Sequence, residues 1–108
     1  MTGVITDETI RQAGELLAEV APPRARIILF GSHARGEPGA GSDLDFLVVE
    51  REVANRIDEA VRLRRALNPL RVPADVIVVS EERVEEWGDV PGTMLHAALT
   101  EGRVLAET

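Results

Sequence analysis

Two aspartates lie one residue apart beside a glycine-rich segment, and this pattern could do chemistry. The stretch from Leu29 to Val49 reads LFGSHARGEPGAGSDLDFLVV, with Asp43 and Asp45 at the start of its second apolar run. Side chains alternate along a strand, so both carboxylates are expected on one face of it. Neighbouring carboxylates repel each other and resist burial, so folding alone gains nothing from them. The pair predicts a site that a positive group completes.

A third carboxylate, Asp75, is expected at the same end of the sheet. The apolar run 43–49 is followed by a helical pattern and then by the run 74–79, and such a crossover ordinarily joins parallel strands, whose N-terminal ends coincide. The connection before Asp43 is short enough for antiparallel pairing with the preceding run, 26–30. Gly31 and Ser32 are therefore expected beside the carboxylates.

The residue types around these aspartates favour a metal and a phosphate. Three oxygen ligands without cysteine favour magnesium or manganese over zinc, and magnesium usually also holds substrate phosphates. The segment GSHARG offers a glycine, a hydroxyl, backbone N–H groups at an expected helix start, and Arg35. An Asp-x-Asp alone would more often be a turn former, and Asp75 alone a strand cap. Their combination with Gly-Ser predicts a divalent cation and a nucleoside triphosphate in one site.

The surrounding elements follow from apolar periodicity and from capping residues. Helix 7–21 precedes the first strand, and a second helix is expected from about Glu52 to before Pro69, with Val53, Ile57, Ala60, Val61 and Leu67 on one face. Ser80 can cap a helix through Trp87, Pro91 can open another to Glu101, and residues 103–106 can form an edge strand. The order α-β-β-α-β-α-α-β predicts an α/β (α+β) domain with a small mixed β-sheet flanked by helices.

Composition limits the classes of protein that remain. The 108 residues are expected to form a single domain. The net charge of −7 argues against non-specific electrostatic binding of nucleic acid. All 12 basic residues are arginines, which excludes the lysine-dependent P-loop, and the absence of cysteine excludes disulfides and thiolate metal sites. No signal peptide and no membrane-spanning run is evident, so we expect a cytoplasmic protein that does not bind a membrane.

These residues resemble a known signature. Gly31-Ser32, ten residues, and then Asp43-Leu44-Asp45 are similar to the GSx10DxD motif of minimal nucleotidyltransferases (MNT) in the DNA polymerase β-like superfamily. The resemblance extends from the leading helix to the terminal EGRVL. It implies the nucleotidyltransferase fold, Mg-ATP as donor (Mn²⁺ being the other candidate metal), Gly31 and Ser32 on the triphosphate, and a phosphate contact for Arg35. It also implies that Asp43, Asp45 and Asp75 are the catalytic metal ligands.

The same resemblance implies a partner. Many such domains are encoded beside a HEPN-domain toxin and act as antitoxins, some by transferring AMP to a tyrosine of that toxin. Two other functions stay open at this point: a catalytically inactive antitoxin that neutralises its partner by binding alone, and a stand-alone nucleotidyltransferase acting on a small molecule. An open domain of 108 residues offers little acceptor specificity, which disfavours the last.

Overall fold

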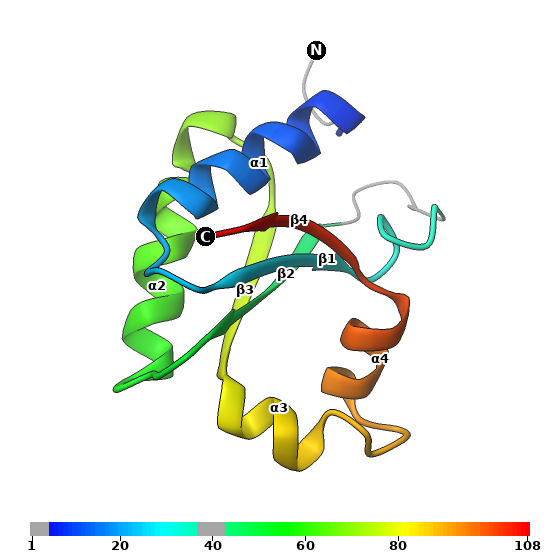
Figure 1. Ribbon diagram of the computed structural model, residues 1–108. Helices are drawn as coiled ribbons and strands as arrows, with labels where there is room; N and C mark the ends of the chain where they lie inside the picture. The colour runs from blue at the N-terminus through cyan, green and yellow to red at the C-terminus, as the bar shows by residue number, and fades with distance from the viewer. Residues whose placement is uncertain (1–4, 37–42) are drawn as a thin grey trace.

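The computed structural model describes residues 5–36 and 43–108. A four-stranded mixed sheet lies at its centre in the order β3-β2-β1-β4, with helices on both faces (Figure 1). The elements are α1 (Asp7–Val20), β1 (Arg26–Phe30), β2 (Leu44–Glu50), α2 (Arg56–Ala66), the short 3₁₀ helix η1 (Asn68–Leu70), β3 (Ala74–Ser80), α3 (Glu81–Trp87), α4 (Met94–Glu101) and β4 (Arg103–Glu107). The expected element order and the α+β class are confirmed.

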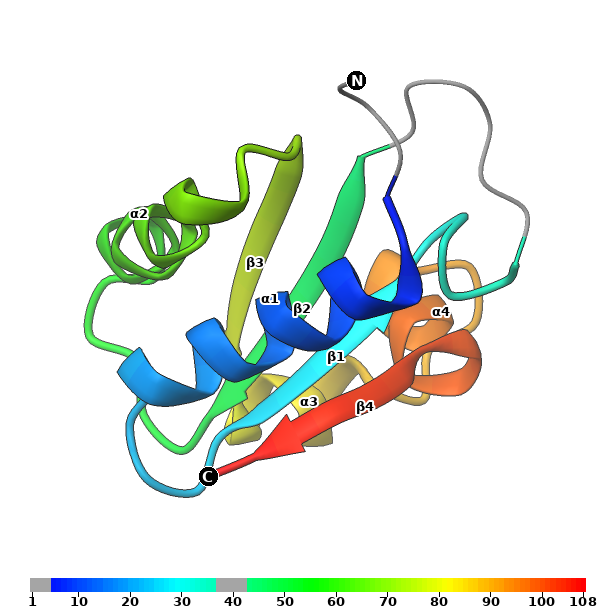
Figure 2. The ribbon, with the colours of Figure 1, turned by 90° about the horizontal axis from the view of Figure 1, so that it is seen from above.

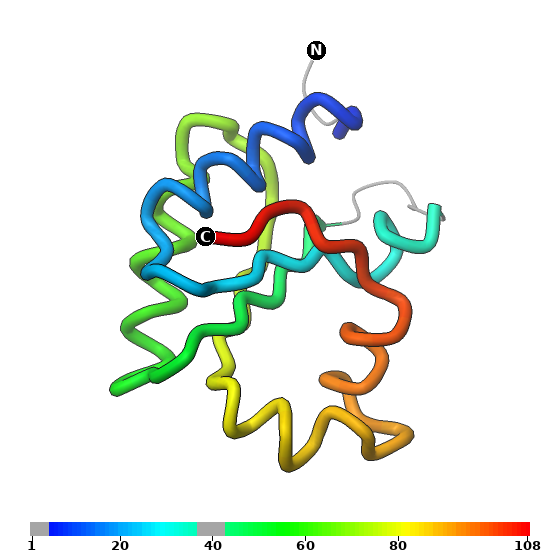
Figure 3. Tube along the Cα trace, in the orientation of Figure 1, coloured from blue at the N-terminus to red at the C-terminus, as the bar shows by residue number. Residues whose placement is uncertain are grey.

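The strand pairing agrees with the expectation from sequence. β1 pairs antiparallel with β2 and with β4, while β2 pairs parallel with β3 through the α2 crossover. The C-terminus returns to the segment before β1, where the Thr108 amide donates to the Ala25 carbonyl at 3.0 Å (Figure 3). β3 and β4 are therefore the two edges of the sheet.

The two faces of the sheet carry separate apolar cores. α1 crosses over β1 and β2 while α2 lies beside β3 (Figure 2), and this face buries Leu17, Phe46 and Leu63 among others. α3 and α4 lie below the sheet in Figure 1, and their face buries Leu47 and Leu95. β2 contributes to both cores, which explains its nearly continuous apolar sequence.

Polar caps decide where the helices begin. Thr6 caps α1, and Ser80 caps α3 as expected. The second helix begins at Arg56 rather than at about Glu52, because the Asn55 side chain accepts from the amides of residues 57 and 58. The last helix begins at Met94 rather than at Pro91, because its cap is Thr93.

The outer side of α2 differs from the sequence expectation. Leu63 and Leu67 are buried against the sheet, but Ile57 is 69% exposed and Val61 is 45% exposed. The periodic face of this helix is therefore only partly used by the core. Within the described residues, no helix combines the length and the apolar character that a membrane crossing requires.

Candidate active site

Three neighbouring strands bring the candidate residues to one end of the sheet. In the strand register Phe30 lies opposite Asp45 on the antiparallel side, and Asp45 lies opposite Asp75 on the parallel side. The β1 C-terminus thus meets the N-terminal ends of β2 and β3. Asp43 lies one residue before β2 and is exposed. Because strand side chains alternate, Asp45 belongs to the face of Leu47, which is the face that α3 and α4 cover.

Gly31 lies directly against the carboxylate of Asp45. A Cβ atom at residue 31 would overlap Oδ2 of Asp45 and would lie 3.3 Å from its Cγ. Gly31 also has a φ of +79°, a left-handed conformation that residues with a side chain rarely adopt. The sequence resemblance implies that this glycine lets a phosphate approach the backbone. The structure shows a close approach to the carboxylate.

Residues 31–36 form turns rather than the expected helix start. The amides of Ala34 and Arg35 donate to the Gly31 carbonyl at 3.1 and 3.2 Å, and the Gly36 amide donates to the His33 carbonyl at 3.4 Å. Gly36 has a φ of +72°, which is incompatible with continuing a right-handed helix. The turn leaves Ser32 half-buried and Arg35 exposed beside the strand ends, with Nη1 of Arg35 3.7 Å from Oε2 of Glu101.

The three carboxylates influence one another electrostatically. Burial raises the pKa of Asp45, and the negative charges of Asp75 and then Asp43 raise it further. His33 and Arg35 act in the opposite direction and lower that pKa. The carboxylates are thus close enough to repel, and basic groups of the turn are close enough to compensate in part.

The carboxylate donors suit a metal ion chemically, but their positions do not form a ready-made metal site. A hard divalent cation relieves the repulsion between the Asp45 carboxylate and the charges of Asp43 and Asp75 that raise its pKa. Across residues 5–36 and 43–108, however, no three His, Cys, Asp or Glu side chains are grouped so that they could hold a metal ion as they stand. A cation would have to draw the carboxylates of residues 43, 45 and 75 together.

Two features of the site escaped sequence analysis. One is His33, which is half-buried in the turn and whose charge lowers the pKa of Asp45. Asp75 also lines a cavity of about 360 Å³ between α2 and β3, together with Ile57 and Val61. The sequence signal for that cavity was the apolar pair at positions 57 and 61, which was taken for core.

Comparison with solved structures gives the same fold. A protein described as a nucleotidyltransferase from Sulfolobus solfataricus is 27% identical over 73% of this chain and 70% of its own, with a TM-score of 0.56. A toxin-antitoxin crystallised with AMP-PNP contains a chain that is 24% identical, with a TM-score of 0.56, over 96% of this chain and 75% of its own.

A third similar structure is a complex of tri-AMPylated Shewanella oneidensis HEPN toxin with MNT antitoxin. Its matching chain is 21% identical, with a TM-score of 0.53, over 96% of this chain and 74% of its own. Among curated proteins none matches by sequence. A family model described as nucleotidyltransferase domain matches residues 10–99, which include the whole candidate site. The chain therefore belongs to the nucleotidyltransferase domain family.

Proposed function

We propose that this chain is a protein adenylyltransferase of the MNT type, which moves AMP from Mg-ATP to a tyrosine hydroxyl of a HEPN-domain toxin and so acts as its antitoxin. The observation that carries the proposal is the row Phe30, Asp45 and Asp75 across three strands, with the Gly31 turn closed against Asp45. Carboxylates and a glycine-serine turn meet there in a chain of the nucleotidyltransferase family. Because the proposed donor is ATP, we place the protein in the cytoplasm.

Each residue has a distinct role in the proposal. Asp43, Asp45 and Asp75 hold a divalent cation, Mg²⁺ or Mn²⁺, which when bound neutralises phosphate charge and polarises the acceptor oxygen. Gly31 and Ser32 receive the triphosphate through backbone N–H and hydroxyl groups, and Arg35 adds a charged contact to a phosphate oxygen. The exposed position of Arg35 and the half-burial of Ser32 support roles at an open donor site.

The reaction follows as an in-line displacement at the α-phosphorus. The acceptor hydroxyl oxygen forms a bond to phosphorus, the bond to the bridging oxygen breaks, and pyrophosphate leaves. The acceptor's proton passes to a carboxylate, for which we assign Asp75. Asp75 suits that role because it is exposed, whereas Asp45 is enclosed by Gly31 and by its neighbouring strands.

Two observations support a protein as the acceptor. Similar folds occur in a complex with AMPylated HEPN toxin and in a toxin-antitoxin with AMP-PNP. The cavity beside Asp75 combines apolar side chains of α2 and β3 with the charged side chains of Arg56, Arg64 and Asp75, a mixture that suits a segment of a protein better than a small polar acceptor.

The experiment is to incubate a purified HEPN-domain protein, the proposed toxin, with Mg-ATP and this protein, to separate the two proteins, and to weigh the HEPN-domain protein intact. A mass increase by one or more AMP units, lost with Asp43→Asn and with Ser32→Ala, is expected. Arg51→Glu is the control, since Arg51 is exposed at the opposite end of β2. An unmodified partner that both wild type and Asp43→Asn inhibit equally would replace the proposal with an antitoxin that acts by binding alone.

A further inference from the structure

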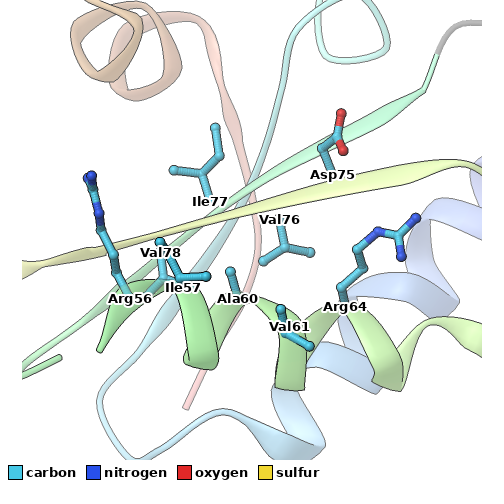
Figure 4. A pocket seen from close by; sticks show the side chains of 9 residues that line it. All are labelled: Arg56, Ile57, Ala60, Val61, Arg64, Asp75, Val76, Ile77 and Val78. Carbon is cyan, nitrogen blue, oxygen red and sulfur yellow. The ribbon is translucent and has the colours of Figure 1, made fainter. Parts of the chain in front are cut away.

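A groove runs along the free edge of the sheet next to the candidate site. β3 is an edge strand, and within the described part of the chain it pairs only with β2. α2 lies along this edge, and between helix and strand is the cavity of about 360 Å³ (Figure 4). Such an edge presents backbone N–H and C=O groups that another strand can pair with, apart from the Ala74 carbonyl, which accepts from Arg64.

The side of the groove that α2 forms carries apolar, solvent-exposed side chains. Ile57 and Val61 are one helical turn apart, so they lie on the same side of α2, and in Figure 4 that side faces Val76 and Val78 of β3. Ile57 is 69% exposed, more than any other large apolar residue described. Apolar side chains gathered beside an open strand edge are typical of a protein-binding surface.

The rim of the groove has the opposite charge to the chain as a whole. Figure 4 shows Arg56 at one end and Arg64 at the other, and Nε of Arg64 donates to the Ala74 carbonyl at 2.9 Å. Asp75 is the single acid among the described residues that line the groove. In a chain with a net charge of −7, two arginines at the ends of an apolar groove complement an acidic ligand.

We propose that an extended, acid-flanked segment of the acceptor protein docks here as an added strand beside β3. The proposal rests on the proposed function, because it names how the acceptor of that reaction is held. Backbone hydrogen bonds to β3 give affinity, and alternate side chains give specificity.

Strand alternation then dictates where the acceptor hydroxyl lies. Side chains on one face of the added strand pack on Ile57 and Val61, and those on the other face lie beside Ile77 and Asp75 (Figure 4). The hydroxyl residue belongs to the second set, at the end of the groove that Asp75 occupies. Acidic residues before and after the apolar positions meet Arg56 and Arg64.

The test compares two exposed apolar positions on opposite edges of the sheet. Ile57→Asp places a charge in the groove, and an aspartate in the first turn of α2 is compatible with the helix. Val104→Asp is the matched control, since Val104 is 51% exposed on β4 at the far edge. Initial rates of AMP transfer to the HEPN-domain protein are measured against its concentration, together with the stabilisation of each variant by Mg-ATP.

Ile57→Asp is expected to raise KM for the acceptor protein at least about tenfold, which corresponds to about 1.4 kcal/mol of binding free energy. Its stabilisation by Mg-ATP and the KM of Val104→Asp are expected to match wild type. Arg56→Glu should raise KM in the same direction, and Arg51→Glu should not.

Hydrogen exchange supplies a readout specific to strand addition. Amides of β3 are expected to gain protection when the HEPN-domain protein binds, and amides of β4 are not. An unchanged KM for AMP transfer by Ile57→Asp would overturn the proposed docking beside β3 and leave the proposed function intact. Unchanged hydrogen exchange of the β3 amides on binding would have the same consequence. A wild type that neither binds nor modifies the partner would overturn both, and the mass measurement on wild type distinguishes the two cases.

Discussion

Gly31, directly after β1, lies so close to the Asp45 side chain of β2 that a side chain at residue 31 would overlap this carboxylate. A Cβ atom at residue 31 would overlap Oδ2 of Asp45 and would lie 3.5 Å from its Cβ. A side chain at residue 31 must therefore displace either the turn that begins there or the carboxylate of Asp45.

Gly31→Ala is expected to abolish AMP transfer and to lower the free energy of unfolding by about 1–3 kcal/mol, because it adds left-handed backbone strain to a clash with Asp45. Urea unfolding in EDTA measures the stability. Gly92→Ala is the matched control, since Gly92 has a φ of +86° with no atom within 4 Å of its Cβ position. Equal losses in the free energy of unfolding for the two variants would mean that the clash with Asp45 adds nothing to the backbone strain.

Asp45→Asn is expected to leave the metal-free protein as stable as wild type or more stable, while transfer is lost. Burial and the charges of Asp75 and Asp43 raise the pKa of Asp45, so the folded state holds a proton more tightly than the unfolded state. The ionised carboxylate therefore destabilises the fold above its ordinary pKa of 3.8, and this penalty is absent at lower pH. The variant's advantage in EDTA should grow as pH rises from about 3 to 7. A large destabilisation at pH 7 would assign Asp45 a structural hydrogen-bonding role.

The topology that assembles this site was accessible from sequence because it follows from general chain geometry. The crossover after residue 49 ordinarily joins parallel strands, and with these strands as neighbours it brings Asp75 to the same end of the sheet as Asp45; the register that sets them side by side comes from the structure. The Gly31 contact was not accessible, because it depends on a φ value and on the β1–β2 register. Spacing reports neither quantity.

Helix ends and helix faces were harder to predict for two physical reasons. Asn55 and Thr93 interrupt segments that otherwise look helical, and their side-chain caps move the helix starts. Ile57 and Val61 follow the helical period as a core residue would, but periodicity shows only that one face of a helix is apolar. It does not show whether the sheet of the same chain covers that face.

Magnesium with ATP is expected to stabilise the folded protein, since under the proposed function both bind only where the strand ends assemble the site. At a free ligand concentration about 100 times the dissociation constant the gain is roughly 2.7 kcal/mol. A thermal melt with and without millimolar Mg-ATP measures it, and Asp43→Asn is expected to reduce the gain. A wild-type melting temperature that does not respond to Mg-ATP would contradict the donor site.

The last prediction concerns Glu50, a buried carboxyl at the opposite end of β2. Glu50 is 2% exposed, and its Oε2 has no hydrogen-bond partner among the described residues. Burial, then a hydrogen bond to Glu59 and the charge of Glu59, raise its pKa to about 8. Glu59 accepts from Nε and Nη2 of Arg62 at 2.8 Å, and these bonds lower its pKa. The pair is thus expected to share one proton at neutral pH, carried by Glu50.

Glu50→Gln is expected to stabilise the protein increasingly as pH rises from about 5 to 8. In that range the unfolded carboxyl has lost its proton and the folded one keeps it, so wild-type stability falls with pH and levels off above about 8. The glutamine amide donates to Glu59 at every pH, and the difference should reach the order of 1 kcal/mol or more. Urea unfolding at several pH values measures it, with the exposed Glu52→Gln as control. Parallel stability curves for wild type and Glu50→Gln would mean that Glu50 is already ionised in the folded protein at neutral pH.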